Sequence, residues 1–251
     1  MKKKLLTIIF LFIVILGIGE VSLRIIGFGN PMVYENKENY YPKSNQKVTR
    51  FMGTQVTINE FGMRAIDNWK NENDKYKILF YGDSVTFGGS YIDNEDLFSE
   101  KLCKLIKNSL CGNYGVNGYQ LHNLNLRIRE TLKKISFDHI IVVVSDSFSS
   151  GKSNFNDFPF YEKFEYNLFR SITEILNHIL FKYNLKNNYH NNQNSNILVK
   201  VTDLDDMINT LTNTKTNIDI FILPSLENLN QGYNKKHFLE NINIKNLKVH
   251  N

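Results

Sequence analysis

The stretch KILFYGDSVTFGGS, residues Lys77 to Ser90, is the strongest indication of the fold of this chain. Its first half is a short apolar run, Ile78 to Tyr81, which predicts a buried parallel strand. The run ends in Gly82-Asp83-Ser84, and two more glycines follow at positions 88 and 89. A serine in this place lies at the carboxyl edge of a sheet, where open α/β folds put their chemistry. The sequence therefore predicts a functional hydroxyl at Ser84.

Strands and helices alternate around this stretch. Residues 140–144 are β-branched or apolar throughout, as in a parallel strand covered on both faces. The expected strands are 55–59, 78–81, 138–145 and 218–223, with a further short strand that breaks into a glycine-rich turn within 111–119. The expected helices include 94–106, with Asn94 as N-cap, 121–135 and 202–211. This alternation predicts a three-layer α/β/α sandwich with a mainly parallel sheet.

The N-terminus has the pattern of a membrane segment. Three lysines, Lys2 to Lys4, precede the apolar run Leu5 to Gly19, and no small-residue cleavage pattern follows it. We expect an uncleaved anchor over residues 1–28, with a cleaved signal peptide as the alternative. The positive-inside rule places the lysines in the cytoplasm and the domain on the extracytoplasmic side. A linker over 29–54 and an α/β domain over 55–251 complete the expected organisation.

The composition is that of a globular protein, with 42% hydrophobic and 13% aromatic residues. The net charge of +5 is dispersed, apart from the N-terminal lysines, which indicates a solvated surface and no nucleic-acid partner. The cysteines and histidines lack zinc-binding spacing, so we expect no metal and no cofactor.

The two cysteines, Cys103 and Cys111, leave two readings open. On one continuous helix they would lie roughly 12 Å apart, too far for a disulfide. A bend near Asn108 would bring them together. We favour two unbridged thiols.

Three motifs that compete for a glycine-flanked serine do not fit. A phosphate-binding loop needs Gly-Lys-Ser/Thr, and no lysine follows Gly88 or Gly89. The spacing of Gly82, Gly88 and Gly89 does not match the dinucleotide fingerprint G-x-G-x-x-G. The nucleophile elbow G-x-S-x-G is excluded because Val85 and Thr86 follow the serine.

The stretch from Tyr81 to Gly88, YGDSVTFG, resembles the first conserved block of the SGNH/GDSL hydrolases. The resemblance implies an SGNH/flavodoxin-like fold and makes Ser84 the nucleophile. The stretch Asn113 to Tyr119, NYGVNGY, resembles the second block, whose glycine supplies a backbone oxyanion donor. We assign that donor to Gly118, with Gly115 as the runner-up.

Two later blocks depart from the family pattern. The third, usually Gly-x-Asn-Asp, reads Val-Val-Ser-Asp here, so Ser145 replaces the asparagine donor and Asp146 follows it. The fifth, Asp-x-x-His, is not recognisable, because His237 and His250 have Asn234 and Leu247 where the aspartate belongs. The catalytic histidine is therefore unassigned, and we expect the domain to be incomplete at its C-terminus.

Together these features lead to a functional hypothesis. The resemblance implies a membrane-anchored serine esterase that removes O-acyl groups, O-acetyl in the first place, from a cell-envelope carbohydrate through an acyl-enzyme at Ser84. Gly82 and Asp83 would support the turn, and Asp83 would act as a hydrogen-bond acceptor there. The alternatives are an O-acyltransferase that uses the same serine, and a non-catalytic or truncated domain that serves as a binding or assembly component.

Overall fold

The computed structural model describes the parts of the chain that form the N-terminal helix and most of the α/β domain. They are residues 2–28, 32, 34–36, 39–50, 54–66, 69, 72, 74–89, 91–145, 166–172, 176, 201–214, 216–223 and 248–250. Asp146 and His237 lie outside these described residues, and so does the side chain of His250.

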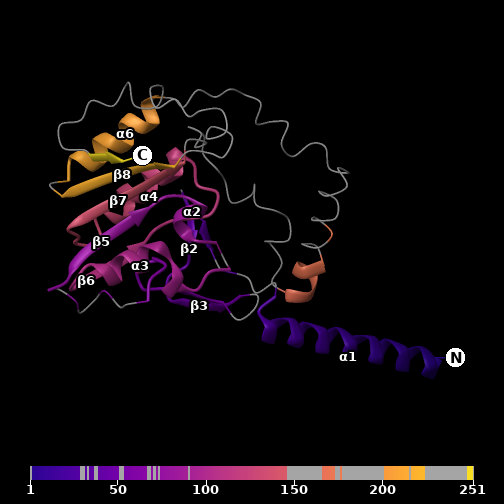
Figure 1. The fold of residues 1–251 in the computed structure, drawn as a ribbon. Helices are drawn as coiled ribbons and strands as arrows, with labels where there is room; N and C mark the ends of the chain where they lie inside the picture. Colours follow the sequence, from indigo (N-terminus) through magenta and orange to yellow (C-terminus); the bar gives the residue numbers. More distant parts are fainter. Residues whose placement is uncertain are drawn as a thin grey trace, which may run out of the picture.

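The domain is built on a parallel five-stranded sheet in the order β6-β5-β7-β8-β9 (Figure 1). The strands are β5 (Tyr76–Tyr81), β6 (Ser109–Asn113), β7 (His139–Ser145), β8 (Asn217–Leu223) and the short β9 (Lys248–His250). The expected α/β fold with a mainly parallel sheet is confirmed.

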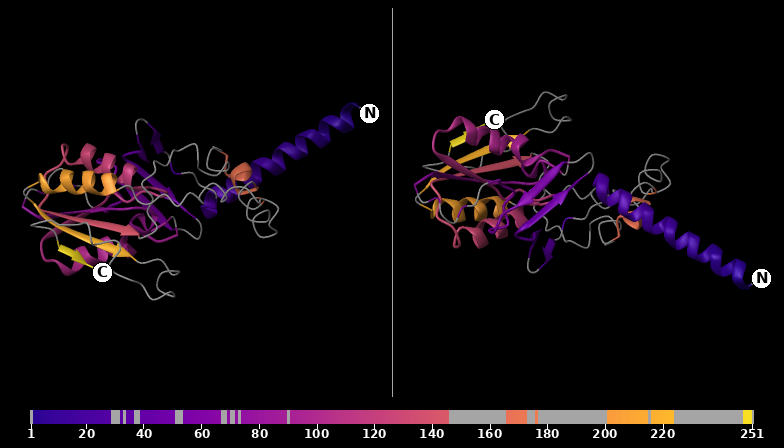
Figure 2. Two further views of the ribbon diagram at one scale, coloured as in Figure 1. Left: turned by 90° about the horizontal axis from the view of Figure 1, so that it is seen from above. Right: turned by 90° about the horizontal axis from the view of Figure 1, so that it is seen from below.

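Helices cover both faces of the sheet (Figure 2). Because side chains alternate along a strand, Leu79 and Tyr81 of β5 enter the larger core cluster, whereas Ile78 and Phe80 enter a smaller one on the opposite face. Helices α4 (Leu121–Thr131) and α6 (Val201–Thr212) contribute to the larger cluster, and α3 (Phe98–Leu105) packs on the smaller one. These are the three layers that the alternation of elements predicted.

Helix α1 (Lys2–Ile26) projects away from the domain (Figures 1 and 2). Its segment Lys3–Ile26 is 24 residues long and has a mean hydropathy of 2.5 over its most apolar window. About 20 apolar residues suffice to span a bilayer, so this helix is long and apolar enough for an anchor or a signal sequence.

Short strands precede the central sheet, partly within the segment expected to be a linker. β1 (Tyr34–Asn36) pairs antiparallel with β2 (Tyr40–Pro42), and β3 (Gln46–Thr49) pairs antiparallel with β4 (Gln55–Ile58). Tyr40 is buried in the larger core cluster, and Val56 and Ile58 cover Phe87, which lies just after Ser84. These strands therefore pack on the domain at the side of its candidate site.

The expectation of two unbridged thiols is wrong. Cys103 and Cys111 form a disulfide with a Cα–Cα distance of 5.7 Å. Helix α3 ends at Leu105, and the chain reverses through Asn108, at φ +57°, into β6. The two cysteines thus lie on adjacent elements, and the bend near Asn108 brings them together.

The expected N-cap at Asn94 is also wrong, because α3 begins four residues later, at Phe98. Asn94 lies in the short 3-10 helix η2 (Asn94–Asp96), and its side chain pairs with the backbone of Thr57 in β4. The side-chain amide of Asn94 supplies both a donor and an acceptor, so it bonds to the backbone of β4 as a neighbouring strand would.

Candidate active site

Ser84 is the first residue of the single-turn helix α2 (Ser84–Phe87), directly beyond the carboxyl end of β5. It is exposed, and within the described residues its hydroxyl makes no hydrogen bond. Asp83 caps the turn, and its Oδ1 accepts from the Val85 N–H at 2.9 Å. The interpretation of Asp83 as an acceptor within its own turn is confirmed.

Gly82 is required because the serine turn lies against strand β7. A Cβ at this position would come within 2.7 Å of the Val143 carbonyl oxygen and 2.0 Å of the Thr86 hydroxyl. No side chain fits at such distances, so only glycine allows this close approach. Gly82 therefore fixes the height and direction of the turn that presents Ser84.

The loop after β6 lies on the other side of the same turn. A Cβ on Gly115 would lie 2.4 Å from the backbone nitrogen of Phe87. Asn113 joins the two segments, since its amide donates to the Thr86 carbonyl at 2.6 Å and accepts from the Gly115 N–H at 2.8 Å. The Val116 N–H also donates to the Gly82 carbonyl at 3.2 Å. The two sequence blocks thus form one packed unit.

The two candidate oxyanion glycines differ in their surroundings. Gly115 is buried, and its N–H already donates to Asn113. Gly118 is exposed at φ +75°, and its N–H donates to no group in the described part of the chain. An oxyanion donor must be free to receive a ligand, so the geometry favours Gly118 over Gly115.

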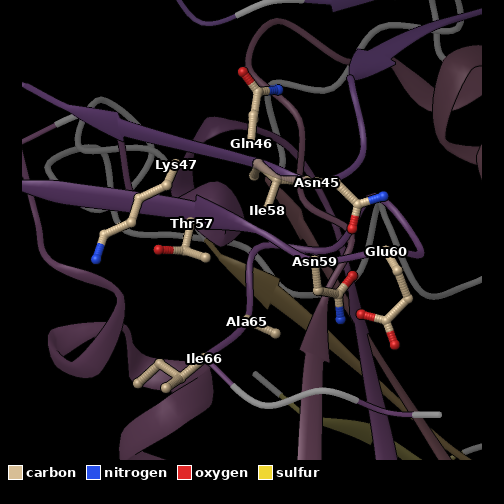
Figure 3. Close-up of a pocket in the computed structure, with 9 residues that line it drawn as sticks. All are labelled: Asn45, Gln46, Lys47, Thr57, Ile58, Asn59, Glu60, Ala65 and Ile66. Carbon is tan, nitrogen blue, oxygen red and sulfur yellow. The ribbon is translucent and has the colours of Figure 1, made fainter.

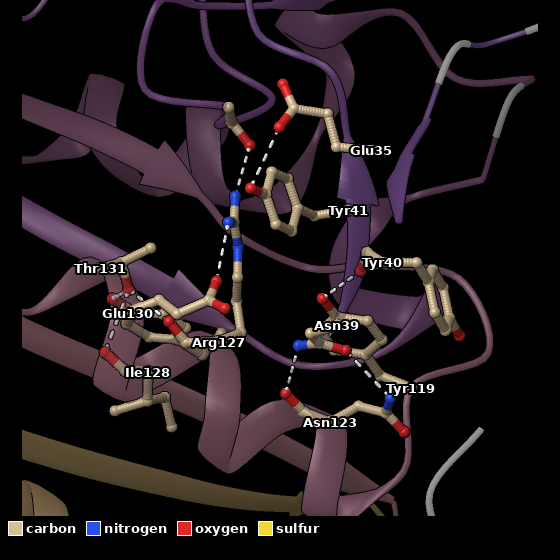
Figure 4. A network of polar contacts seen from close by, with 12 residues as sticks. Glu35, Asn39, Tyr40, Tyr41, Tyr119, Asn123, Arg127, Ile128, Glu130 and Thr131 are labelled. Carbon is tan, nitrogen blue, oxygen red and sulfur yellow. Dashed lines mark hydrogen bonds and ion pairs between the residues drawn. The ribbon is translucent and has the colours of Figure 1, made fainter. Parts of the chain in front are cut away.

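Tyr40 bonds to the residues on both sides of Gly118. Its hydroxyl donates to the Asn117 carbonyl at 2.9 Å, and its own carbonyl accepts from the Tyr119 hydroxyl at 2.5 Å (Figure 4). Asn39 and Asn123 add a reciprocal pair of hydrogen bonds beside it. Sequence reasoning missed Tyr40, since nothing in a polar segment signals a partner 77 residues away.

Ser145 is the last residue of β7, at the same edge of the sheet as Ser84. Tyr81, the last residue of β5, is in register with Val142 of β7, and the chain then turns through Gly82 and Asp83 into α2, which begins with Ser84. The sheet order places β5 between β6 and β7. The loop after β6 that carries Gly118 and the end of β7 at Ser145 therefore lie on the two sides of β5, the strand that leads to Ser84.

Arg64 is a second residue that sequence reasoning missed. Its buried guanidinium donates to the carbonyl oxygens of Phe87, Gly89 and Ile92. Nε also donates to the Asn94 side chain at 3.0 Å. Its backbone N–H donates to the Asn113 carbonyl at 2.8 Å. One residue thus ties the loop that follows the serine to the end of β6.

Burial shifts the pKa values of two ionisable side chains near the serine turn, Arg64 and Asp83. It lowers the pKa of Arg64 to about 10, so the guanidinium remains a cation at neutral pH. It raises the pKa of Asp83 above the usual value of a carboxyl, while hydrogen bonds from the N–H groups of Val85 and Thr86 act in the opposite direction.

A cavity of about 280 Å³ lies beside β3 and β4 (Figure 3). Its walls are Asn45, Gln46, Lys47, Thr57, Ile58, Asn59, Glu60, Ala65 and Ile66. None of these residues belongs to α2 or to the 113–118 loop, so the cavity is separate from Ser84. The described residues also contain no group of three or more His, Cys, Asp or Glu side chains that could hold a metal ion.

His139 offers no base for Ser84. His139 begins β7, at the opposite edge of the sheet, and both of its ring nitrogens have partners, Tyr76 and Asp219. His250 is in register with Phe221 of β8, and its side chain lies outside the described part, as do His237 and Asp146.

No known protein-family model matches the chain, and no curated protein matches it. Several solved structures do match the chain. One is AlinE4, an SGNH-hydrolase family esterase, at 17% identity and a TM-score of 0.37, covering 62% of this chain and 64% of that one. Another is a member of the lipolytic protein G-D-S-L family from Veillonella parvula DSM 2008, at 16% identity and a TM-score of 0.39, covering 69% and 76%.

A third match is described as a putative platelet activating factor from Streptococcus pneumonia, at 16% identity and a TM-score of 0.34, covering 72% of this chain and 67% of that one. The chain is distantly similar in structure to SGNH/GDSL esterases. It spans less than two thirds of the length of AlinE4. The similarity concerns the fold.

Proposed function

We propose that this protein is a serine esterase of the SGNH/GDSL type that acts through an acyl-enzyme at Ser84. The observation that carries the proposal is the exposed Ser84 at the start of a turn that packs between β7, through Gly82, and the 113–116 loop, with the exposed turn of Gly118 at the same edge of the sheet. The substrate would be an O-acyl ester, O-acetyl in the first place, on a cell-envelope carbohydrate.

The reaction would proceed in two halves. The Ser84 oxygen attacks the acyl carbon while its proton passes to a base, and the sugar oxygen leaves with a proton. Water then attacks the acyl-enzyme, releases the acid and restores the hydroxyl. The N–H groups of Ser84 and Gly118, with the Ser145 hydroxyl in place of an amide, would stabilise the charge on the tetrahedral oxygen. An O-acyltransferase would replace this water with a second sugar hydroxyl.

The N-terminal helix supports the location of this chemistry. Lys2 to Lys4 lie at the start of an apolar helix of spanning length. We propose from the positive-inside rule that the domain is on the extracytoplasmic side. We propose that α1 is retained as an anchor and keeps the domain close to envelope glycans.

A second candidate function is a non-catalytic binding or assembly component. Two observations favour it: Ser145 occupies the place of the usual asparagine, and no Asp-x-x-His block is recognisable in the sequence. A weak nucleophile without a base would acylate slowly.

A fluorophosphonate probe separates the two candidates. The esterase should be labelled at Ser84, as located by mass spectrometry of the labelled peptide, and should hydrolyse p-nitrophenyl acetate, whereas Ser84→Ala should do neither. The loss of turnover should exceed about 10³-fold, as when a nucleophile is removed. Folded Ser84→Ala, checked by its thermal midpoint, is the negative control.

Ser145→Asn sharpens the test, because it restores the longer amide donor. Loss of one oxyanion donor costs roughly 10²- to 10³-fold in rate, so this variant should be labelled faster than the natural protein, and Ser145→Ala more slowly. If neither the natural protein nor Ser145→Asn is labelled or active, the esterase proposal fails and the binding role stands.

A further inference from the structure

A short helical segment outside the central domain carries its apolar side chains toward solvent. Residues 167–172 are helical, and the large side chains of Tyr166, Phe169, Ile172 and Leu176 are 61%, 52%, 45% and 50% exposed. Their spacings of three and four residues place them on one face, which we call the 166–176 face.

The opposite side of this segment is polar and buried. Asn167, Arg170 and Ser171 are at most 3% exposed. A surface helix of a water-soluble domain has the reverse arrangement, with its apolar stripe inward and its polar residues in water. The 166–176 face is therefore built for an apolar surrounding.

The segment lies beside the domain-proximal half of α1 (Figures 1 and 2). The backbone N–H groups of Asn167 and Leu168 donate to the Glu20 carboxylate at 3.0 and 2.7 Å. Arg24 donates to the same carboxylate at 2.7 Å. The Glu20 carboxylate thus accepts from three groups of the protein itself, as a carboxylate near a membrane requires.

The depth of this contact follows from helix geometry. From Leu5 to Glu20 the helix rises about 22 Å, at 1.5 Å per residue. With a hydrocarbon core of about 30 Å that begins at Leu5, Glu20 lies about 8 Å inside the far boundary. Interfacial helices bury their apolar faces about 5–10 Å into that boundary, and aromatic side chains are enriched there.

We propose that the 166–176 face is a lipid-binding surface, inserted into the interfacial layer of the bilayer that α1 spans. The apolar surface of the face continues that of α1, which is exposed along its length. The proposal rests on α1 being a retained anchor. It implies that the domain is held at a fixed distance from the membrane, with Glu20 as the connection between anchor and surface.

Environment-sensitive probes on the full chain test this. Cys103 and Cys111 are its only cysteines and form a disulfide, so a cysteine introduced elsewhere is a single reactive thiol. Phe169→Cys and Ile172→Cys would be labelled with NBD and reconstituted in vesicles of phosphatidylcholine and phosphatidylglycerol. Leu105→Cys, at an 83% exposed apolar position on α3, is the matched control. Phe12→Cys reports on α1 itself.

The expected result is blue-shifted emission at positions 169, 172 and 12, with quenching by doxyl-labelled lipid and loss of quenching by iodide, while position 105 is quenched by iodide alone. Equal iodide quenching at 169 and 105 overturns the proposal. Protection of 169 from both quenchers means that protein covers the face, and also overturns it. A probe at position 12 that iodide reaches overturns the anchor, and this proposal with it, but leaves the esterase proposal standing.

Discussion

The two edges of the central sheet use polar side chains in opposite ways. At the amino edge, His139 contacts Tyr76 through Nδ1 at 3.3 Å and Asp219 through Nε2 at 2.8 Å. At the carboxyl edge, Ser84 is exposed, and within the described residues its hydroxyl has no partner. The amino edge has a histidine–carboxylate pair without a nucleophile, and the carboxyl edge has a candidate nucleophile without an assigned base.

This contrast between the two edges indicates which polar groups are available for chemistry. A side chain whose hydrogen-bonding groups are all used joins strands, as His139 joins β7 to β5 and β8. A hydroxyl left open at the edge where the loops after parallel strands converge can receive a ligand. A histidine next to an aspartate is therefore not by itself a catalytic pair.

The largest expected effect is at Arg64, which supports the carboxyl edge. Arg64→Met removes the donor to three carbonyl groups, and each buried unpaired group costs about 1–3 kcal/mol. The free energy of unfolding, measured by urea denaturation in mild detergent, should fall by about 3 kcal/mol or more. Fluorophosphonate labelling of the molecules that remain folded should slow, because Phe87 belongs to the turn that begins at Ser84.

Arg129→Met is the matched control, since Arg129 is exposed on α4 and donates to Thr210. It should change stability by no more than about 0.5 kcal/mol. If both variants behave alike, Arg64 has no special role at this edge.

The next effect is expected at the disulfide. Cys103→Ser with Cys111→Ser opens a loop with a sequence separation of 8, and the chain-entropy model gives a loss of about 2.5 kcal/mol. The urea midpoint of the double variant should match that of the natural protein under a reductant. The labelling rate at Ser84 should not change, and a slower rate would show that the α3–β6 connection also positions the carboxyl edge.

A smaller effect is expected at the amino edge. His139 and Asp219 are both about one-fifth exposed, so their pair should contribute at most about 1 kcal/mol. A double-mutant cycle with His139→Gln and Asp219→Asn measures this coupling. Labelling at Ser84 should be the same in all four proteins, and its loss in His139→Gln would overturn the separation of the two edges.

The smallest effect concerns the pH dependence that Asp83 contributes. Its pKa is raised in the folded state, so the folded protein binds this proton more tightly than the unfolded chain does. The contribution to stability is therefore fully present at low pH and is lost as pH rises through the folded pKa. Asp83→Asn keeps a good N-cap without the charge, so its stability should lack this decline.

Urea unfolding of both proteins from about pH 3.5, near the usual pKa of a carboxyl, to about pH 7 would measure this effect. The stability of Asp83→Asn relative to the natural protein should increase with pH. A decrease would mean that the carboxylate is stabilising where it lies. Labelling of Ser84 should persist in this variant, since Asp83 serves the turn.

Much of the architecture was predictable from local patterns. The apolar runs that became β5, β7 and β8, the spacing of α4 and the long apolar N-terminal segment all carry their signal in neighbouring residues. The same holds for the Gly82-Asp83-Ser84 turn, because a strand that stops at a glycine-flanked serine is a local event. The position of Ser84 follows from such a pattern, whereas Gly118 follows from the resemblance to the second SGNH/GDSL block, and their catalytic roles stay predictions.

The sequence alone therefore determined the α/β alternation, the apolar helix and the position of the serine at a strand end. Three contacts could be seen only in the tertiary structure. They are the hydrogen bond of Tyr40 to the Gly118 turn, the support of the loop after the serine by Arg64 and Asn94, and the disulfide between Cys103 and Cys111. Periodicity shows which face of an element is buried, but it does not show against what. These partners are 8 to 77 residues apart in the sequence, and they meet only because the packed sheet brings them together.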